Sequence, residues 1–248
     1  MAEFINTDLR GSLFERVDLS GARLRSVDLS GVVMRGVDLI DVEIHGDIHH
    51  LVINEVDVGP LITEELDRRF PLRSKMRPTD PAGFKEAWDI IERLWGESVD
   101  RARHLPPELL HRSVNQEWTF IETLRHLVFA TDSWVIRAIL GEPSPWDALG
   151  LPWDEMPDDL PVPRDRDVRP SLDAVLELRR DRMATVRDVI EHLSVESLDR
   201  DTEPVNAPGW PPPQSFPVRR CLLIVLNEEW EHRRYAERDL AVLEATGV

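Results

Sequence analysis

The sequence predicts a mainly α protein in which a four-helix bundle follows a short segment of five-residue repeats. Past Pro81, apolar residues recur at spacings of three and four, the pattern of helices that face a core. Before residue 59, bulky apolar residues recur at every fifth position instead. The chain has 248 residues, 42% of them hydrophobic, which is enough for one large soluble domain or two modest ones.

The N-terminal repeat runs through residues 2–58, with one residue dropped after Ile44. Up to Ile44, a small or β-branched residue stands two positions before each bulky one. A period of five belongs neither to an α-helix nor to a flat strand. The bulky central residues are Phe4, Leu9, Phe14, Leu19, Leu24, Leu29, Met34, Leu39, Ile44, Ile48, Ile53 and Val58.

In stretches such as VDLSG and ARLRS, this segment resembles the pentapeptide-repeat family. The resemblance implies a short right-handed β-helix with four sides, whose interior is filled by the central residues and those two positions earlier. The aspartates of the repeat would face outward, and we expect the histidines near residues 45–50 to be exposed loop residues. Whether the segment is a scaffold or an interaction surface stays open.

Residues 59–80 mix charged residues with three prolines, and we expect a connector with at most a short helix. Residues 81–248 then form the bundle. Its first helix carries the apolar stripe Phe84, Trp88, Ile91, Trp95 and Val99. The other three helices are expected near residues 119–140, 171–193 and 218–244.

The predicted second helix has clear signals at both ends. Thr119 and Glu122 have the spacing of a capping box, and Gly141 stops the helix. Two long stretches rich in proline and tryptophan, residues 141–170 and 194–217, separate the later helices. Loops of this length are usually functional or disordered. Their tryptophans are compatible with the walls of a pocket and equally with packing over the bundle ends.

A group of candidate metal ligands lies on the second and fourth helices. Glu228 and His232 are four residues apart, so their side chains project from one helix face, and their neighbours on it are mostly apolar. His126 lies on a face of small and hydroxylic residues. Three N and O donors from facing helices are how bundles build interior metal sites. A hydrogen-bonded core histidine and a surface ion pair are the alternatives. Glu229 projects about 100° away, so we expect its replacement to change nothing.

The stretches EWTFIETLRHLVFATDSW and VLNEEWEHRRYAERDL resemble the DinB superfamily, and the resemblance spans residues 81–248. It implies a metal ion in a four-helix bundle, held by one residue of the second helix and a pair in the last. His126 and His232 match the first and last of these ligands. Glu228 stands where the family usually has histidine. Two His and one carboxylate favour zinc and also match the facial triad of non-haem iron(II), while nickel and manganese stay open.

Two further residues are candidates for substrate binding, and no catalytic residue is assigned. Arg137 is expected to bind an anionic substrate at a pocket mouth or to pair with an acid, and Trp134 to form a pocket wall or part of the core. Trp118 is interpreted in the same way. Cys221 is either a nucleophile or, more simply, a buried structural thiol.

The DinB resemblance implies an activity as well as a fold. Characterised relatives include transferases that use a low-molecular-weight thiol such as mycothiol or bacillithiol as co-substrate, with a small electrophile as the other partner. A non-haem iron oxidase and a metal-dependent hydrolase are alternatives. A third is a non-enzymatic DNA mimic, because residues 1–58 carry eleven acidic and five basic residues, although the coil is short beside a duplex.

Composition limits the partners and the compartment. A formal charge of −17 argues against general nucleic-acid binding, which needs clustered Lys and Arg. The sequence has no apolar run of membrane-spanning length and no N-terminal signal pattern. The single cysteine fits a reducing compartment. We therefore expect a cytoplasmic protein without nucleic-acid or membrane partners, and a homodimer is compatible with the repeat ends.

Overall fold

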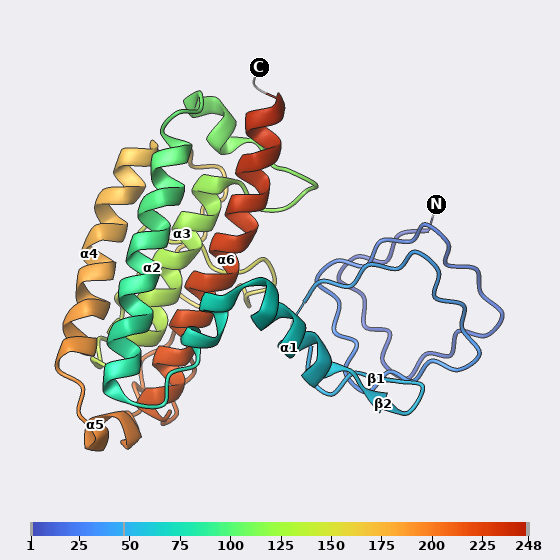
Figure 1. Ribbon diagram of the computed structural model, residues 1–248, viewed down its shortest axis with the longest axis horizontal. Helices are drawn as coiled ribbons and strands as arrows, with labels where there is room; N and C mark the ends of the chain where they lie inside the picture. The colour runs from blue at the N-terminus through green and yellow to red at the C-terminus, as the bar shows by residue number, and fades with distance from the viewer. Residues whose placement is uncertain (1, 47, 247–248) are drawn as a thin grey trace. The chain divides into compact units, whose positions relative to one another are not determined.

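Four long helices dominate the computed structural model, which describes residues 2–46 and 48–246 (Figure 1). The mainly α fold class is confirmed. Helices α2 and α6 pack against each other, and α3 contacts both α4 and α6. Their shared core is built from buried side chains of all four helices. The bounds are α2 Pro81–Ala102, α3 Phe120–Thr131, α4 Leu172–Glu191 and α6 Val218–Thr246.

Local signals in the sequence fix where these helices begin. The Asp80 side chain accepts a hydrogen bond from the Gly83 N–H at the start of α2. At the start of α3, Thr119 and Glu122 form the predicted capping box. At the start of α4, the Ser171 hydroxyl accepts a hydrogen bond from the Ala174 N–H. Because four N–H groups at each helix start lack an intrahelical partner, these caps place the ends where the sequence indicates them.

Beyond Thr131, α3 continues as a π-helix, η3, over Asp132–Arg137. Two side chains of this segment hold the loop that follows. Ser133 Oγ accepts from the Trp146 indole N–H at 3.1 Å, and Asp132 accepts from the Asp147 main-chain N–H at 3.2 Å. Single π-helical turns are frequent near functional sites. Here the turn ties the 141–170 loop to the helix that carries His126.

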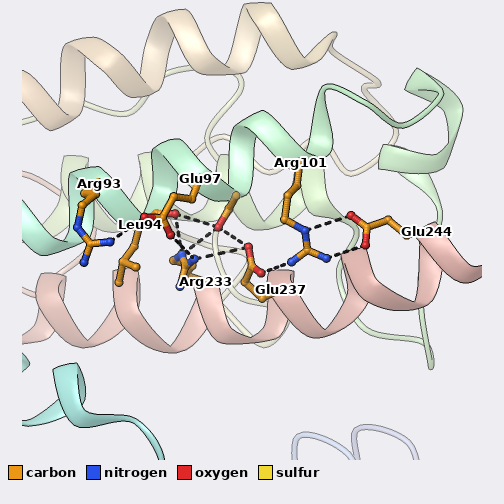
Figure 2. A network of polar contacts seen from close by, with 8 residues as sticks. Arg93, Leu94, Glu97, Arg101, Arg233, Glu237 and Glu244 are labelled. Carbon is orange, nitrogen blue, oxygen red and sulfur yellow. Dashed lines mark hydrogen bonds and ion pairs between the residues drawn. The ribbon is translucent and has the colours of Figure 1, made fainter.

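A ladder of charged side chains joins α2 to α6 (Figure 2). Arg101 pairs with Glu237 and with Glu244, and Arg233 donates to the Leu94 carbonyl oxygen at 2.8 Å. The ladder extends the contact between the two helices beyond their apolar stripes. It therefore helps to fix the position of α6, which carries two of the candidate ligands.

The connector contains two helical segments, which is more than the single short helix that was expected. Helix α1 spans Gly59–Arg69, and a 3-10 helix, η1, spans Pro71–Met76. The η1 segment packs along α6. At its start, the Phe70 ring centroid lies 4.4 Å from the guanidinium of Arg234 in α6. The remaining elements are short: β1 Val52–Ile53, β2 Val56–Asp57, the 3-10 helix η2 Pro107–His111 and α5 Val195–Asp199. Strands β1 and β2 pair antiparallel.

The repeat keeps its five-residue period in the backbone. Residues with φ in the left-handed region recur at every fifth position: Asn6, Gly11, Arg16, Gly21, Ser26, Gly31, Gly36 and Asp41. Turn hydrogen bonds close the corners at Gly11, Gly21 and Gly31, such as that from the Ser12 N–H to the Leu9 carbonyl oxygen at 3.1 Å.

The expectation of a β-helix with a filled interior was wrong for this structure. No strand is assigned within residues 2–46, and the central side chains are exposed, Phe14 by 57% and Leu19 by 58%. Among these residues, the described backbone hydrogen bonds close corners and do not join one coil to the next. The central residues of this segment therefore do not form a buried interior.

The chain divides into two compact units between His45 and Gly46. The β1–β2 hairpin therefore groups with the helical unit, while the boundaries at residues 58 and 80 remain predictions. Among the described residues, every helix is too short or too polar to cross a lipid bilayer.

Candidate metal centre

The structure brings the three predicted ligands together between α3 and α6. One donor atom each from His126, Glu228 and His232 lies within 4.8 Å of the other two. Glu228 Oε2 lies 3.3 Å from His126 Nε2 and 3.0 Å from His232 Nε2. The His126 side chain is 8% exposed, whereas those of Glu228 and His232 are 30% and 20% exposed. The cluster is therefore closed on the α3 side and reachable from solvent on the α6 side.

The tautomer of His126 follows from its second ring nitrogen. Nδ1 lies 3.0 Å from the Leu151 carbonyl oxygen, which can only accept, so Nδ1 carries the proton. Burial lowers the pKa of His126, and this outweighs the opposing influence of the nearby Glu228 carboxylate, so the ring is neutral near pH 7. The Nε2 lone pair of a neutral ring then faces a carboxylate oxygen. Two acceptors at this distance repel unless a cation or a proton lies between them, which fits a metal site.

Glu228 is ionised in this setting. Burial by itself raises the pKa of a carboxyl group, but the imidazoles of His126 and His232 close beside it outweigh that effect and hold the pKa of Glu228 well below its usual range. The cluster therefore offers one anionic oxygen and two imidazole nitrogens. Such a donor set suits zinc and other divalent first-row ions.

Aromatic rings surround the two histidines. The Trp118 ring is stacked on His232, with centroids 5.7 Å apart and an angle of 12°, and lies 4.6 Å from His126. Its indole N–H donates to Asp154 at 3.1 Å. Tyr235 contacts His232 edge-on. Trp118, which immediately precedes the capping box, is thus the tryptophan at the site. The position of Trp118 near the site could have been anticipated, because it precedes the N-cap Thr119 and so lies about two helical turns before His126.

Trp134, the tryptophan chosen as a substrate-binding candidate, lies elsewhere. It packs edge-on against Phe216 with ring centroids 5.3 Å apart, and its other apolar contacts are with the core. Eight residues after His126, a side chain on a regular helix lies about 80° round the helix axis from it, so Trp134 faces a different neighbour. The prediction that Trp134 lines the site is therefore not supported.

Arg137 is also not at a pocket mouth. Its residue exposure is 1%, and its donors reach carbonyl oxygens of both long loops. The acceptors are Pro143 in the first loop and Val205, Ala207 and Pro211 in the second. A buried guanidinium needs such partners. Arg137 thus holds the two loops against the bundle, and the expectation of an anion-binding residue is corrected.

Cys221 is a buried structural thiol. It is fully enclosed, and burial raises the pKa of its thiol to about 12, so it carries no thiolate near neutral pH. The reading of Cys221 as a nucleophile is therefore not supported.

Glu229 is not the inert neighbour that its position on the helix predicted. Its side chain is 1% exposed and accepts two hydrogen bonds of 2.9 Å from Arg179 of α4, which is itself 3% exposed. The Arg179 guanidinium also lies 5.2 Å from the Trp95 ring centroid. Adjacent carboxylates therefore serve two buried arrangements. Glu228 faces the histidines, and Glu229 forms an ion pair between α4 and α6.

A helical bundle whose facing helices present two histidines and a carboxylate at mutual contact distance has a donor set that could hold a metal ion in its interior. Residues 90–236 match the family model of the DinB superfamily, and the chain belongs to that superfamily. Residues 2–40 match eight copies of the pentapeptide repeat. Neither the curated proteins nor the solved structures contain a match to this chain.

Proposed function

We propose that this chain is a metal-dependent enzyme that transfers a low-molecular-weight thiol, of the mycothiol or bacillithiol class, to a small electrophile. The observation that carries the proposal is the cluster of donor atoms from His126, Glu228 and His232 within 4.8 Å of one another. Two imidazoles and one carboxylate hold zinc while leaving a coordination position for substrate. A divalent ion held there would lower the pKa of a bound thiol and favour its thiolate form.

The residues of the site have distinct tasks in this reaction. Glu228 and His232 lie on the solvent-accessible side, where a thiol can enter, while buried His126 is fixed by Leu151. Trp118 stacks on the His232 imidazole and lies tilted beside that of His126. The thiol gives its proton to solvent, and its sulfur forms a bond to the electrophilic carbon. With an epoxide the C–O bond breaks and the oxygen takes a proton from water. With an aryl chloride, chloride leaves.

This proposal predicts metal-dependent consumption of a thiol. Zinc-loaded protein, mixed with an epoxide or a chlorinated aromatic, should consume mycothiol, bacillithiol or glutathione faster than the metal-free protein does. Free thiol is measured over time with a chromogenic disulfide reagent. Glu228→Ala serves as the matched control and should show only the uncatalysed rate. The absence of a metal-dependent rate with all three thiols, across a panel of electrophiles, would contradict the transferase proposal.

The carboxylate at position 228 supports a second candidate function. Two histidines and one carboxylate are also the ligand set of non-haem iron(II) enzymes that react with dioxygen. If this reading holds, protein loaded with iron(II) should consume dioxygen in the presence of a thiol, and zinc-loaded protein should not. Dioxygen uptake, followed with an electrode, distinguishes the two candidates.

A further inference from the structure

A buried arginine lies beside the first candidate ligand. Arg125 precedes His126 in α3 and is fully enclosed. A buried cation is costly unless its donors are satisfied. Its Nε donates to the Leu149 carbonyl oxygen at 2.8 Å, and its terminal nitrogens reach the carbonyl oxygens of Asp165 and Val168 at 2.5 Å and 3.5 Å. All three acceptors belong to the 141–170 loop, so Arg125 holds two separate parts of that loop, near Leu149 and near Asp165–Val168, against α3.

The same loop supplies the hydrogen-bond partner of His126. Leu151, two residues after Leu149, is fully buried. Its N–H donates to the main-chain carbonyl oxygen of Arg125 at 3.2 Å, and its own carbonyl oxygen accepts from His126 Nδ1 at 3.0 Å. Two contacts with Arg125, through the Leu149 carbonyl oxygen and the Leu151 N–H, thus attach the loop to α3 next to the Leu151 carbonyl group that orients the imidazole.

We propose that Arg125 is a positioning residue of the metal centre, which determines through Leu151 that His126 presents Nε2 to Glu228 and His232. The inference deepens the proposed function and rests on it for the role of the metal. A neutral imidazole exchanges its proton between two nitrogens, and a fixed carbonyl acceptor selects the tautomer whose other nitrogen is free to bind. When the Arg125 side chain is removed, the Leu149–Leu151 segment loses its hydrogen bond to that side chain. The Leu151 carbonyl oxygen is then held less firmly, and the preference for the Nδ1–H tautomer of His126 weakens.

The test compares two buried arginines that both hold loops by their carbonyl oxygens. Arg125→Met should weaken zinc binding roughly 10–100-fold, as expected for loss of a group that orients a ligand. Arg137→Met is the matched control, because Arg137 is equally enclosed but reaches Pro143 and the second loop. It should lower thermal stability and leave zinc affinity within about threefold of the wild type, since it spares the partner of His126. Affinity is measured by competition with a chromogenic zinc chelator.

A second readout does not depend on the metal. In metal-free full-length protein, above the titration range of histidine, long-range ¹H–¹⁵N NMR spectra distinguish a ring protonated at Nδ1 from one protonated at Nε2. His126 should be an Nδ1–H tautomer in the wild type and in Arg137→Met, and a mixture in Arg125→Met. Arg125→Lys keeps a cationic donor, so its fraction of Nδ1–H tautomer should lie between those of the wild type and Arg125→Met. It carries the same test if Arg125→Met does not fold.

Two results would overturn the proposal: equal zinc affinities for Arg125→Met and Arg137→Met when the wild type binds zinc, or an unchanged His126 tautomer in both Arg125 variants. If the wild type binds no zinc but the His126 tautomer still differs between the wild type and Arg125→Met, only the proposed function is contradicted. The positioning role would then stand for the ring of His126. The two failures are therefore distinguishable.

Discussion

Glu228→Ala should bind zinc far more weakly than the wild type, and His126→Ala and His232→Ala should do the same. Each substitution removes one of the three donor atoms that lie within 4.8 Å of one another. The loss of affinity should exceed the roughly 10–100-fold effect expected for a residue that only orients a ligand. Competition with a chromogenic chelator measures the affinity of all three variants under identical conditions.

Two further variants make this series specific. Glu228→His restores the residue that the superfamily usually has at this position and should retain zinc, because imidazole nitrogen is as good a donor as a carboxylate oxygen. Glu231→Ala removes a carboxylate from the same helix that pairs with Arg234 at 2.7 Å and lies outside the cluster. It should bind zinc like the wild type. Wild-type affinity in Glu228→Ala would show that this carboxylate is not a ligand.

Glu229→Ala should be strongly destabilised, although Glu229 holds no metal. It leaves Arg179 as a buried guanidinium without its bidentate carboxylate partner, and breaking a buried pair in this way costs about 3–5 kcal/mol. For a chain of this size, the thermal midpoint should fall by roughly 6–20 °C. Differential scanning calorimetry measures the change, and the fraction that remains folded should still bind zinc.

The controls separate a buried ion pair from an exposed one. Glu97→Ala removes the partner of Arg93, a pair whose side chains are both 54% exposed, and should cost less than about 1 kcal/mol. Replacing both buried partners, Arg179→Met with Glu229→Leu, should recover much of the stability, because no unpaired charge remains. A midpoint for Glu229→Ala as high as that of Glu97→Ala would contradict the structural role of the buried pair.

Much of the helical unit could be predicted from periodicity and end signals. The stripe that includes Phe84, Trp88 and Ile91 is buried, and the capping box at Thr119 is present. The approach of Glu228 and His232 followed from their spacing of four. Their meeting with His126 required only that α3 and α6 face each other, which the superfamily resemblance implied. These features depend on local sequence or on one helix–helix contact.

The features that were missed depend on how distant segments meet. Glu229 was expected to point away from the interior, but Arg179 reaches it from α4 while Glu228 faces α3, so faces about 100° apart are both enclosed. The roles of Arg125 and Arg137 depend on where two long loops return to the bundle, and periodicity carries no information about irregular loops. One signal was present. Arg125 is a lone cation in the run FIETLRHLVFAT, where a buried charge requires partners.

The central claim, that His126, Glu228 and His232 hold a divalent metal ion, is tested most directly by elemental analysis of the full-length protein. The protein should be purified without a nickel column, incubated with zinc and dialysed, alongside His126→Ala treated in the same way. We expect about one metal ion per chain in the wild type, as three donors with one open position require, and little in the variant. A wild type that retains no more metal than His126→Ala would contradict the claim.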